Sequence, residues 1–284
     1  MIPAAFDYVA PSTVDDAVRA LSEAGEDAKV IAGGQSLLPV LRMRLAAPSK
    51  LIDLGRVAAL RGVREEGDFL VIGSMTTHYD VQHDPLIRDH ATLLALATDM
   101  VGDPQIRHRG TFGGSLAHAD PAADLPAVAL ALDAEMVVRG MDGTRTVPAA
   151  EFFTDFFTTA LRPTEILVEV RVPKMTGWSA HYEKFNRVAQ AWAIVAVAAA
   201  VRVSDGAIAE ARVGLTNMAS VPVRATAVEQ ALVGQPATAE SIRAAAAHAA
   251  EGTSPPSDGN ADTAYRQHLA QVLTSRAVAA AAGV

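Results

Sequence analysis

The sequence predicts an α+β protein, with two sheet-bearing N-terminal lobes followed by a C-terminal antiparallel sheet covered by helices. In the first two thirds of the chain, short apolar runs alternate with helical patterns. In the last third, three strand patterns precede three helical ones: His181–Phe185, Trp192–Val203, Ile208–Leu215, then Arg224–Leu232, Ala239–Ala250 and Ala264–Ala282. We therefore expect the two lobes at residues 1–55 and 56–175 and the C-terminal domain at residues 178–284.

The first lobe begins with a β-α-β pattern. Ser12 or Thr13 can cap its helix, because a short hydroxyl side chain accepts a hydrogen bond from the first helical turn. We expect strands at Phe6–Val9, Lys29–Ala32 and Leu51–Leu54, and a helix at Leu37–Leu45. In the second lobe, strands are expected at residues 63–64, 69–72, 135–139, 145–147 and 166–172, and helices at residues 79–82, 91–101 and 124–132.

Composition excludes several classes of function. The formal charge of −8 argues against a nucleic-acid surface, which needs a basic face. Cys is absent, so this chain holds no disulfide, no Cys-ligated zinc and no conventional iron–sulfur cluster. The run Ala191–Val201 is too short to span a bilayer, which takes about 20 residues. The N-terminus also lacks a secretory pattern, so we expect a cytoplasmic protein.

Two segments pair adjacent glycines with hydroxyl side chains. The first glycine loop, Ala32-Gly33-Gly34-Gln35-Ser36, follows a strand and leads into a helix at Leu37. The second glycine loop, Thr111-Phe112-Gly113-Gly114-Ser115, repeats the pattern. Glycine lets backbone N–H groups approach a phosphate, and a helix start adds donors. Each loop alone could equally be a turn that needs positive φ, but together they suit a ligand with two phosphates and sugar hydroxyls.

Other polar residues have two readings each. Asp124 could accept bonds from a ribose or ribityl hydroxyl, or cap the helix that follows it. His78 and His118 could lie near a cofactor or satisfy local hydrogen bonds. No His pair has metal-ligand spacing, no catalytic triad is evident, and no metal site is expected.

These motifs, with Gly73–Thr77 between them, resemble the medium, FAD-binding subunits of molybdenum hydroxylases. This is the xanthine dehydrogenase family, and the pattern is most similar to its aerobic carbon monoxide dehydrogenases. The resemblance covers nearly the whole chain, to Tyr265, Arg266 and Leu269 in the last helix. It implies a vanillyl-alcohol-oxidase-type FAD fold, with the cofactor between the two lobes. Both glycine loops would hold the pyrophosphate and adjoining sugar.

The resemblance also implies roles for three residues beyond the loops. Asp124 would contact the flavin nucleotide, and Lys184 would lie near the flavin ring, where a cation favours the anionic reduced flavin. The alternative for Lys184 is a solvated strand charge. Relatives carry Gly-Asp-aromatic where this chain has Gln190-Ala191-Trp192. Trp192 could stack on the flavin ring or belong to the core, and the missing aspartate puts in doubt its role toward an electron acceptor.

What the resemblance implies about function is an electron-transfer flavoprotein. A large partner subunit would carry the molybdenum cofactor, and a small one two [2Fe–2S] clusters, in a dimer of heterotrimers. Electrons would pass through FAD to quinone, dioxygen or a nicotinamide, and any membrane association would be peripheral, at the inner face, through the complex. Alternatives are a self-sufficient FAD oxidoreductase, the flavin subunit of a nicotine, purine or aldehyde hydroxylase, and a non-catalytic scaffold.

Overall fold

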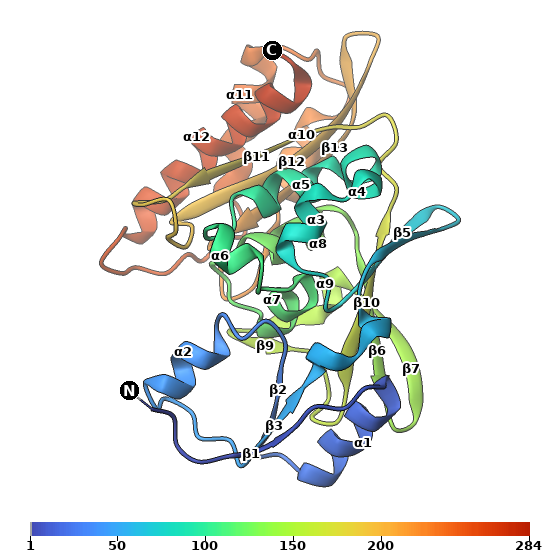
Figure 1. Ribbon diagram of the computed structural model, residues 1–284. Helices are drawn as coiled ribbons and strands as arrows, with labels where there is room; N and C mark the ends of the chain where they lie inside the picture. Colours follow the sequence, from blue (N-terminus) through green and yellow to red (C-terminus); the bar gives the residue numbers. More distant parts are fainter. Residues whose placement is uncertain (1) are drawn as a thin grey trace.

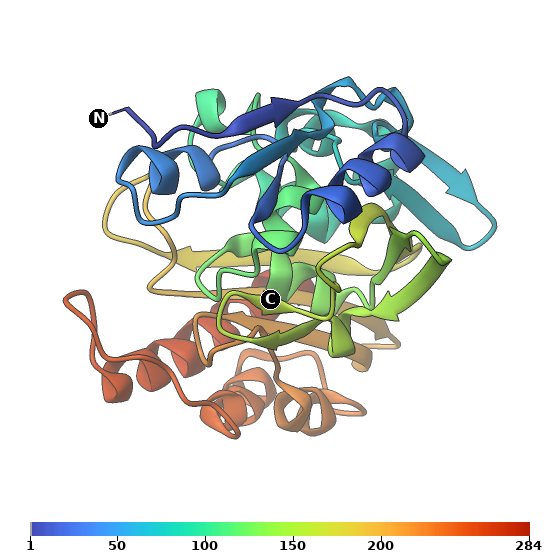
Figure 2. The same cartoon turned by 90° about the horizontal axis from the view of Figure 1, so that it is seen from below.

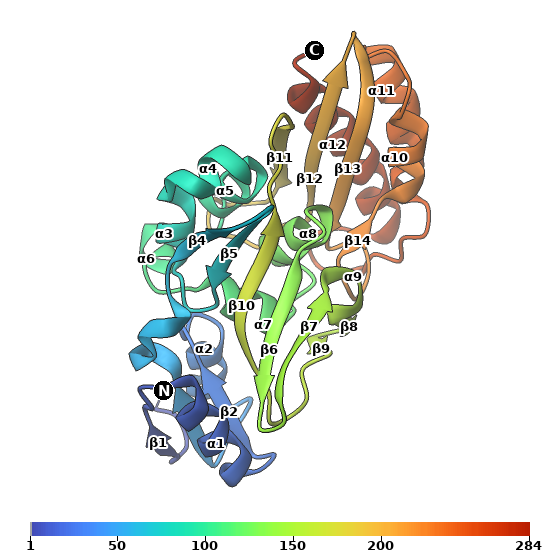
Figure 3. The same cartoon turned by 90° about the vertical axis from the view of Figure 1, so that its right-hand side faces the viewer.

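The computed structural model describes residues 2–284, in which three main sheets follow one another along the molecule (Figure 3). The first lobe holds a parallel sheet of order β1-β3-β2. Its elements are β1 (Asp7–Val9), α1 (Val14–Ala24), β2 (Ala28–Ile31), α2 (Leu37–Arg42) and β3 (Lys50–Asp53). The short helices η1 (Leu54–Arg56) and η2 (Ala58–Leu60) lead into the second lobe. Thr13 caps α1, and its hydroxyl accepts a bond from the N–H of Asp16. The predicted cap is confirmed.

The second lobe holds an antiparallel sheet of order β4-β5-β10-β6-β7. Its helices lie on one side of this sheet (Figure 1). The strands are β4 (Val63–Glu66), β5 (Phe69–Gly73), β6 (Glu135–Gly140), β7 (Gly143–Pro148) and β10 (Ile166–Pro173), with a separate hairpin of β8 (Phe153–Asp155) and β9 (Thr158–Thr159). The helices are α3 (His78–His83), α4 (Pro85–His90), α5 (Thr92–Asp99), α6 (Pro104–Arg107), α7 (Phe112–His118), α8 (Asp124–Ala131) and α9 (Ala149–Phe152).

The C-terminal domain holds an antiparallel sheet of order β11-β12-β13-β14. The strands are β11 (Ser179–Phe185), β12 (Val195–Ser204), β13 (Ala207–Thr216) and β14 (Val223–Arg224). One face carries α10 (Thr226–Leu232), α11 (Ala239–Ala246), η3 (Ala247–Ala250) and α12 (Thr263–Ala282), while the other faces α5 and α8 (Figure 2). Within residues 2–284, no helix combines the length and hydropathy that crossing a membrane requires.

Burial on both faces explains the long apolar run in β12. Its side chains alternate, as in any strand. Ala196 and Ala198 belong to the core shared with the second lobe, whereas Val195 and Val197 belong to the core under the C-terminal helices. Small side chains on the inner face let α8 approach closely. A Cβ at Gly214 on β13 would lie 2.3 Å from the carbonyl oxygen of residue 127.

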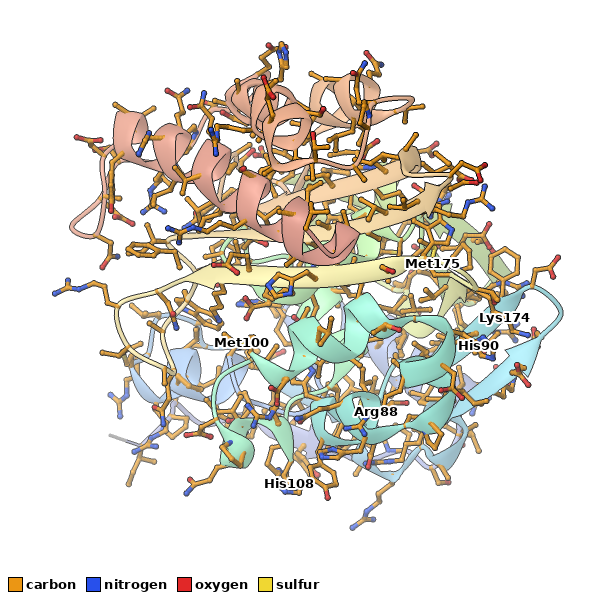
Figure 4. All side chains as sticks on the ribbon, turned by 90° about the horizontal axis from the view of Figure 1, so that it is seen from above. Arg88, His90, Met100, His108, Lys174 and Met175 are labelled. Atoms are coloured by element: carbon orange, nitrogen blue, oxygen red, sulfur yellow. The ribbon has the colours of Figure 1, made fainter. Side chains whose placement is uncertain are left out.

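The segment that connects the second lobe to the C-terminal domain forms a hydrogen bond and an ion pair with the second lobe. The N–H of Met175 donates to the carbonyl of His90 at the end of α4, over 2.7 Å. Lys174 forms an ion pair with Glu65 on β4, with 2.9 Å between Nζ and Oε1. Figure 4 shows His90, Lys174 and Met175 gathered on one side of the molecule. The two domains therefore meet through this fixed segment as well as through the sheet.

Helix α7 was not predicted, and two local expectations were wrong. The second glycine loop is the first turn of helix α7, because Thr111 caps that helix and its hydroxyl accepts from Gly114. Asp124 does not cap α8; Ala123 occupies the cap position and the Asp124 side chain turns to other partners. Trp192 lies before β12 rather than in it, since the strand begins at Val195.

Candidate functional site

The first glycine loop connects β2 to α2 and leaves its backbone donors free. Within the part of the chain that the structure describes, the N–H groups of residues 33–36 donate to no backbone or side-chain acceptor. Gly34 has φ 75°, a conformation that strongly favours glycine. The Gln35 side chain turns back to the carbonyl of Gly33, at 3.3 Å. A run of unbonded N–H groups at a strand–helix turn is the arrangement that binds phosphate.

The second glycine loop differs, because its backbone donors already have acceptors. Phe112 donates to Thr76 at 3.0 Å, and Gly113 donates to Ser74 at 2.9 Å. The N–H groups of Gly114 and Ser115 donate to the hydroxyl and the carbonyl of Thr111. The Ser115 hydroxyl is partly accessible and forms no hydrogen bond with the described residues. This loop therefore offers a ligand its side chains rather than its amides.

The two glycine loops lie in direct contact. A Cβ at Gly33 would lie 2.1 Å from the carbonyl oxygen of Arg109, just before the second loop. A Cβ at Gly114 would lie 3.3 Å from the Cβ of Ala32. Glycine at position 33 thus lets the lobes meet without steric clash. The structure brings together two segments that are almost 80 residues apart in the sequence.

Buried polar groups from the segment after β5 lie beneath the second loop. A Cβ at Gly113 would lie 2.4 Å from that of Ser74, whose hydroxyl is buried without a partner. His78 lies against Gly110; its N–H donates to the Gly110 carbonyl, and its ring Nδ1 is buried and unpaired. Burial, together with the charge of Arg107, lowers the pKa of His78 to about 4. The ring is therefore neutral near pH 7.

Asp124 and Lys184 form a buried ion pair between α8 and β11. Lys184 Nζ lies 2.9 Å from Asp124 Oδ2, and both side chains are 2% exposed or less. Lys184 also donates to the carbonyl of Met100, at 3.0 Å. The hydroxyl of Tyr182 donates to Asp124 Oδ1 at 2.6 Å. The alternative of a solvated Lys184 is therefore wrong, since this lysine is one of the most buried charges in the described residues.

Opposing effects set the charge state of this pair. Burial raises the pKa of Asp124, while the charge and hydrogen bond of Lys184 and the hydrogen bond of Tyr182 lower it; nearby Asp120 raises it. A carboxylate at the first position of α8 also faces the positive end of the helix dipole. The pair is close to neutral overall, so Lys184 does not act as an isolated cation.

Trp192 lies on a surface cleft between the second lobe and the C-terminal domain. Its side chain is 56% exposed, so the alternative that it belongs to the core is wrong. The cleft has a volume of about 700 Å³, and Phe156 and Phe157 also line it. Just after Trp192, Asn217 and the buried Arg266 bond the carbonyl of Ile194. This fixes the chain where β12 begins.

The residues fit a bound dinucleotide. The free amides of the first loop, the accessible hydroxyl of Ser115, and the unpaired Ser74 and His78 groups surround the contact between the two lobes. Leu37, Thr111 and Phe112 belong to the helix starts that shape this contact. Asp124, Lys184 and Trp192 lie toward the C-terminal domain.

Sequence reasoning missed Tyr182 and Ser74 as site residues. A strand that alternates Tyr182 with Lys184 places both side chains on one face, and this periodicity could have identified Tyr182. Nothing in the sequence marks Ser74 as buried. Among residues 2–284, no group of three or more His, Asp or Glu side chains could hold a metal ion.

Comparison with known proteins gives the family. Residues 4–175 match the family model for the FAD binding domain in molybdopterin dehydrogenase, and residues 180–281 match the CO dehydrogenase flavoprotein C-terminal domain. The chain is 41% identical to the carbon monoxide dehydrogenase medium chain of Hydrogenophaga pseudoflava, over 99% of this chain and 98% of the relative.

Solved structures give the same result. A carbon monoxide dehydrogenase structure from Hydrogenophaga pseudoflava superposes with a TM-score of 0.96 at 43% identity, covering 99% of this chain and 98% of that one. Quinoline 2-oxidoreductase from Pseudomonas putida 86 superposes with a TM-score of 0.95 at 33% identity, covering 100% and 99%. The chain therefore belongs to the family of FAD-binding subunits of molybdopterin dehydrogenases, which includes the carbon monoxide dehydrogenase medium chains.

Proposed function

We propose that this chain is the FAD-binding, electron-transfer subunit of a molybdenum hydroxylase of the carbon monoxide dehydrogenase type. The observation that carries the proposal is the run of unbonded amides at residues 33–36, in a loop that contacts the second glycine loop segment through Gly33 at Arg109 and Ala32 at Gly114. Family membership supports FAD as the ligand. When bound, FAD supplies the chemistry of taking up electrons singly and passing them on in pairs.

Each predicted site residue has a proposed task. The amides of Gly33, Gly34, Gln35 and Ser36 would bind the pyrophosphate, with Ala32 and Leu37 shaping the turn. Gly113 and Gly114 would allow close packing, while Thr111 and Phe112 fix the start of α7 and Ser115 donates to a phosphate or sugar oxygen. His78, neutral at pH 7, would support the second loop from beneath.

We propose that the flavin portion of the cofactor extends toward the three remaining residues. Asp124, at the start of α8, would accept from a sugar or ribityl hydroxyl with the lone pairs that Tyr182 and Lys184 leave free. Lys184 would hold the carboxylate rather than act as a free cation. Trp192 would stack on the flavin ring, since it is exposed at the cleft beside residues 120–122. We propose that the fold is of the vanillyl-alcohol-oxidase type, with FAD between residues 1–55 and 56–175.

Substrate oxidation would take place in a partner chain. Relatives are named as medium chains or subunits of larger complexes, which supports a large molybdenum-cofactor subunit and a small iron–sulfur subunit, assembled as a dimer of heterotrimers. Carbon monoxide is the proposed substrate, because the carbon monoxide dehydrogenase medium chain is 41% identical over the full length. A quinone is the proposed acceptor, reached in the cytoplasm or at the inner face of the membrane.

Purification of this chain together with the proposed large and small subunits tests the proposal. We expect the three chains to elute together in gel filtration, with visible flavin absorbance that carbon monoxide bleaches under anaerobic conditions. A complex without flavin absorbance would overturn the FAD assignment. A lone polypeptide that oxidises substrate would instead support a self-sufficient FAD oxidoreductase. Bleaching by an N-heterocycle but not by carbon monoxide would reassign the substrate to the class that quinoline 2-oxidoreductase represents.

A further inference from the structure

Tyr182 stands out among the buried polar side chains because its hydroxyl reaches from the C-terminal domain to Asp124, the proposed contact of the flavin nucleotide. The ring is 6% exposed, and the hydroxyl lies 2.6 Å from Asp124 Oδ1. On β11, Tyr182 and Lys184 share a face, and each donates to a different oxygen of the same carboxylate. Asp124 is thus held at both oxygens by one strand of another domain.

The Tyr182 hydroxyl can act only as a donor toward this carboxylate. Burial and the neighbouring Asp124 raise the pKa of Tyr182 well above its ordinary value, so the hydroxyl stays protonated at any working pH. A buried carboxylate needs such donors, because hydrogen bonds to the charged form offset the cost of removing it from water. Lys184 and Tyr182 are the side-chain donors that Asp124 has within the described residues.

The packing of the ring would not itself require this hydroxyl. The Tyr182 ring is part of the core between the second lobe and the C-terminal sheet, where a phenylalanine would fill the same volume. The hydroxyl instead orients the carboxylate, because it donates to Oδ1 while Lys184 donates to Oδ2. Lys184 is itself held by the carbonyl of Met100. The Asp124 side chain therefore has one orientation about its terminal bond.

We propose that Tyr182 is a positioning residue of the cofactor site, which orients the Asp124 carboxylate, and through it Lys184, toward the bound flavin nucleotide. This inference rests on the proposed function, since it takes Asp124 as a contact to FAD. It adds Tyr182 to Lys184 and Trp192 as residues that the C-terminal domain contributes to the proposed site. It also explains why α8 and β11 are joined by a buried, fully hydrogen-bonded group rather than by apolar contacts alone.

The Tyr182→Phe variant tests the proposal in the full chain, with Tyr8→Phe as matched control. Tyr8 also donates its hydroxyl to an aspartate, at 2.5 Å from Asp53 Oδ2, but on the exposed face of the first lobe. We expect Tyr182→Phe to weaken FAD binding, measured by quenching of flavin fluorescence, by about tenfold, the change that 1.4 kcal/mol produces. We also expect it to shift the flavin midpoint potential. Tyr8→Phe should leave both quantities unchanged.

A double variant separates orientation from simple destabilisation. In the Asp124→Asn background, Tyr182→Phe should have little further effect on FAD affinity, because the carboxylate it orients is already gone. Equal losses in the two backgrounds, or an unchanged affinity and potential in Tyr182→Phe, would overturn the positioning role. If the wild-type chain takes up no FAD, it is the proposed function that fails, and thermal unfolding of the apoproteins then reports only the structural contribution of the hydroxyl.

Discussion

The two glycine loops have nearly the same composition but opposite hydrogen-bonding states. In the first, the N–H groups of residues 33–36 have no acceptor in the described structure, and Gly34 adopts positive φ. In the second, the N–H groups of residues 112–115 are all bonded within the lobe. Adjacent glycines thus serve two different purposes here: open donors for a ligand in one loop, and close approach of backbone to backbone in the other.

The difference follows from what lies on each side of the loops. The first loop follows β2, an edge strand of the first lobe, and contacts the second lobe through Gly33 at Arg109 and Ala32 at Gly114. The second loop begins α7, which packs on Ser74 and is followed by α8, at whose start Asp124 lies. A rigid second loop can support a first loop whose donors remain available. Each of the following variants tests one side of this comparison.

The largest loss of stability is expected when Asp124, which follows the second loop in the chain, loses its buried partner Lys184. Lys184→Met leaves the Asp124 carboxylate buried without its cation, and removing one partner of a buried pair costs about 3–5 kcal/mol. Urea unfolding of the apoprotein measures this loss. The double variant Asp124→Asn/Lys184→Met should recover much of it, because no uncompensated charge remains. A Lys184→Met protein as stable as wild type would show that the pair does not anchor this segment.

Acid should affect the second loop through His78. Its pKa of about 4 in the folded protein lies below the ordinary value of 6.5, so the unfolded chain binds a proton first. The contribution of neutral His78 to the free energy of unfolding is therefore fully present above about pH 6.5. It is lost as the pH decreases toward 4, and the loss is about 3 kcal/mol. In His78→Gln the free energy of unfolding should fall less steeply across that interval. His118 remains in both proteins, so equal slopes would contradict the role of His78.

Glycine-to-alanine substitutions should distinguish the role of glycine in the packing of the second lobe from its role in the contact between the lobes. Gly113→Ala places a Cβ against Ser74, inside the second lobe, and overpacking of this kind costs about 1–3 kcal/mol. Gly33→Ala places a Cβ against Arg109, between the lobes, so we expect FAD affinity to fall by more than the stability of the apoprotein does. Gly259→Ala, with no neighbour within 4 Å, is the control for both. The comparison fails if both glycine-loop variants change affinity and stability in the same proportion.

Sequence reasoning found most elements because their patterns are local. Thr13 capped α1 as expected, and the apolar pattern of Trp192–Val203 predicted a strand that covers most of β12. The sequence could not show which N–H groups of the glycine loops are already hydrogen-bonded. In the second loop, two of the acceptors are the carbonyls of Ser74 and Thr76, which belong to a separate segment of the chain. For the same reason, the sequence left open whether Lys184 is a solvated charge, because its partner Asp124 lies 60 residues away.

The smallest expected effect tests which atoms each loop offers. Ser36 and Ser115 end the two loops, and neither hydroxyl bonds to a described residue. If the first loop binds through its amides and the second through side chains, Ser115→Ala should weaken FAD binding by about threefold to tenfold, the range expected for one hydrogen bond. Ser36→Ala should change it less, since the amides of residues 33–36 remain. Isothermal titration of the apoproteins with FAD measures both, and a larger loss in Ser36→Ala would reverse the assignment, because the first loop would then depend on its side chain.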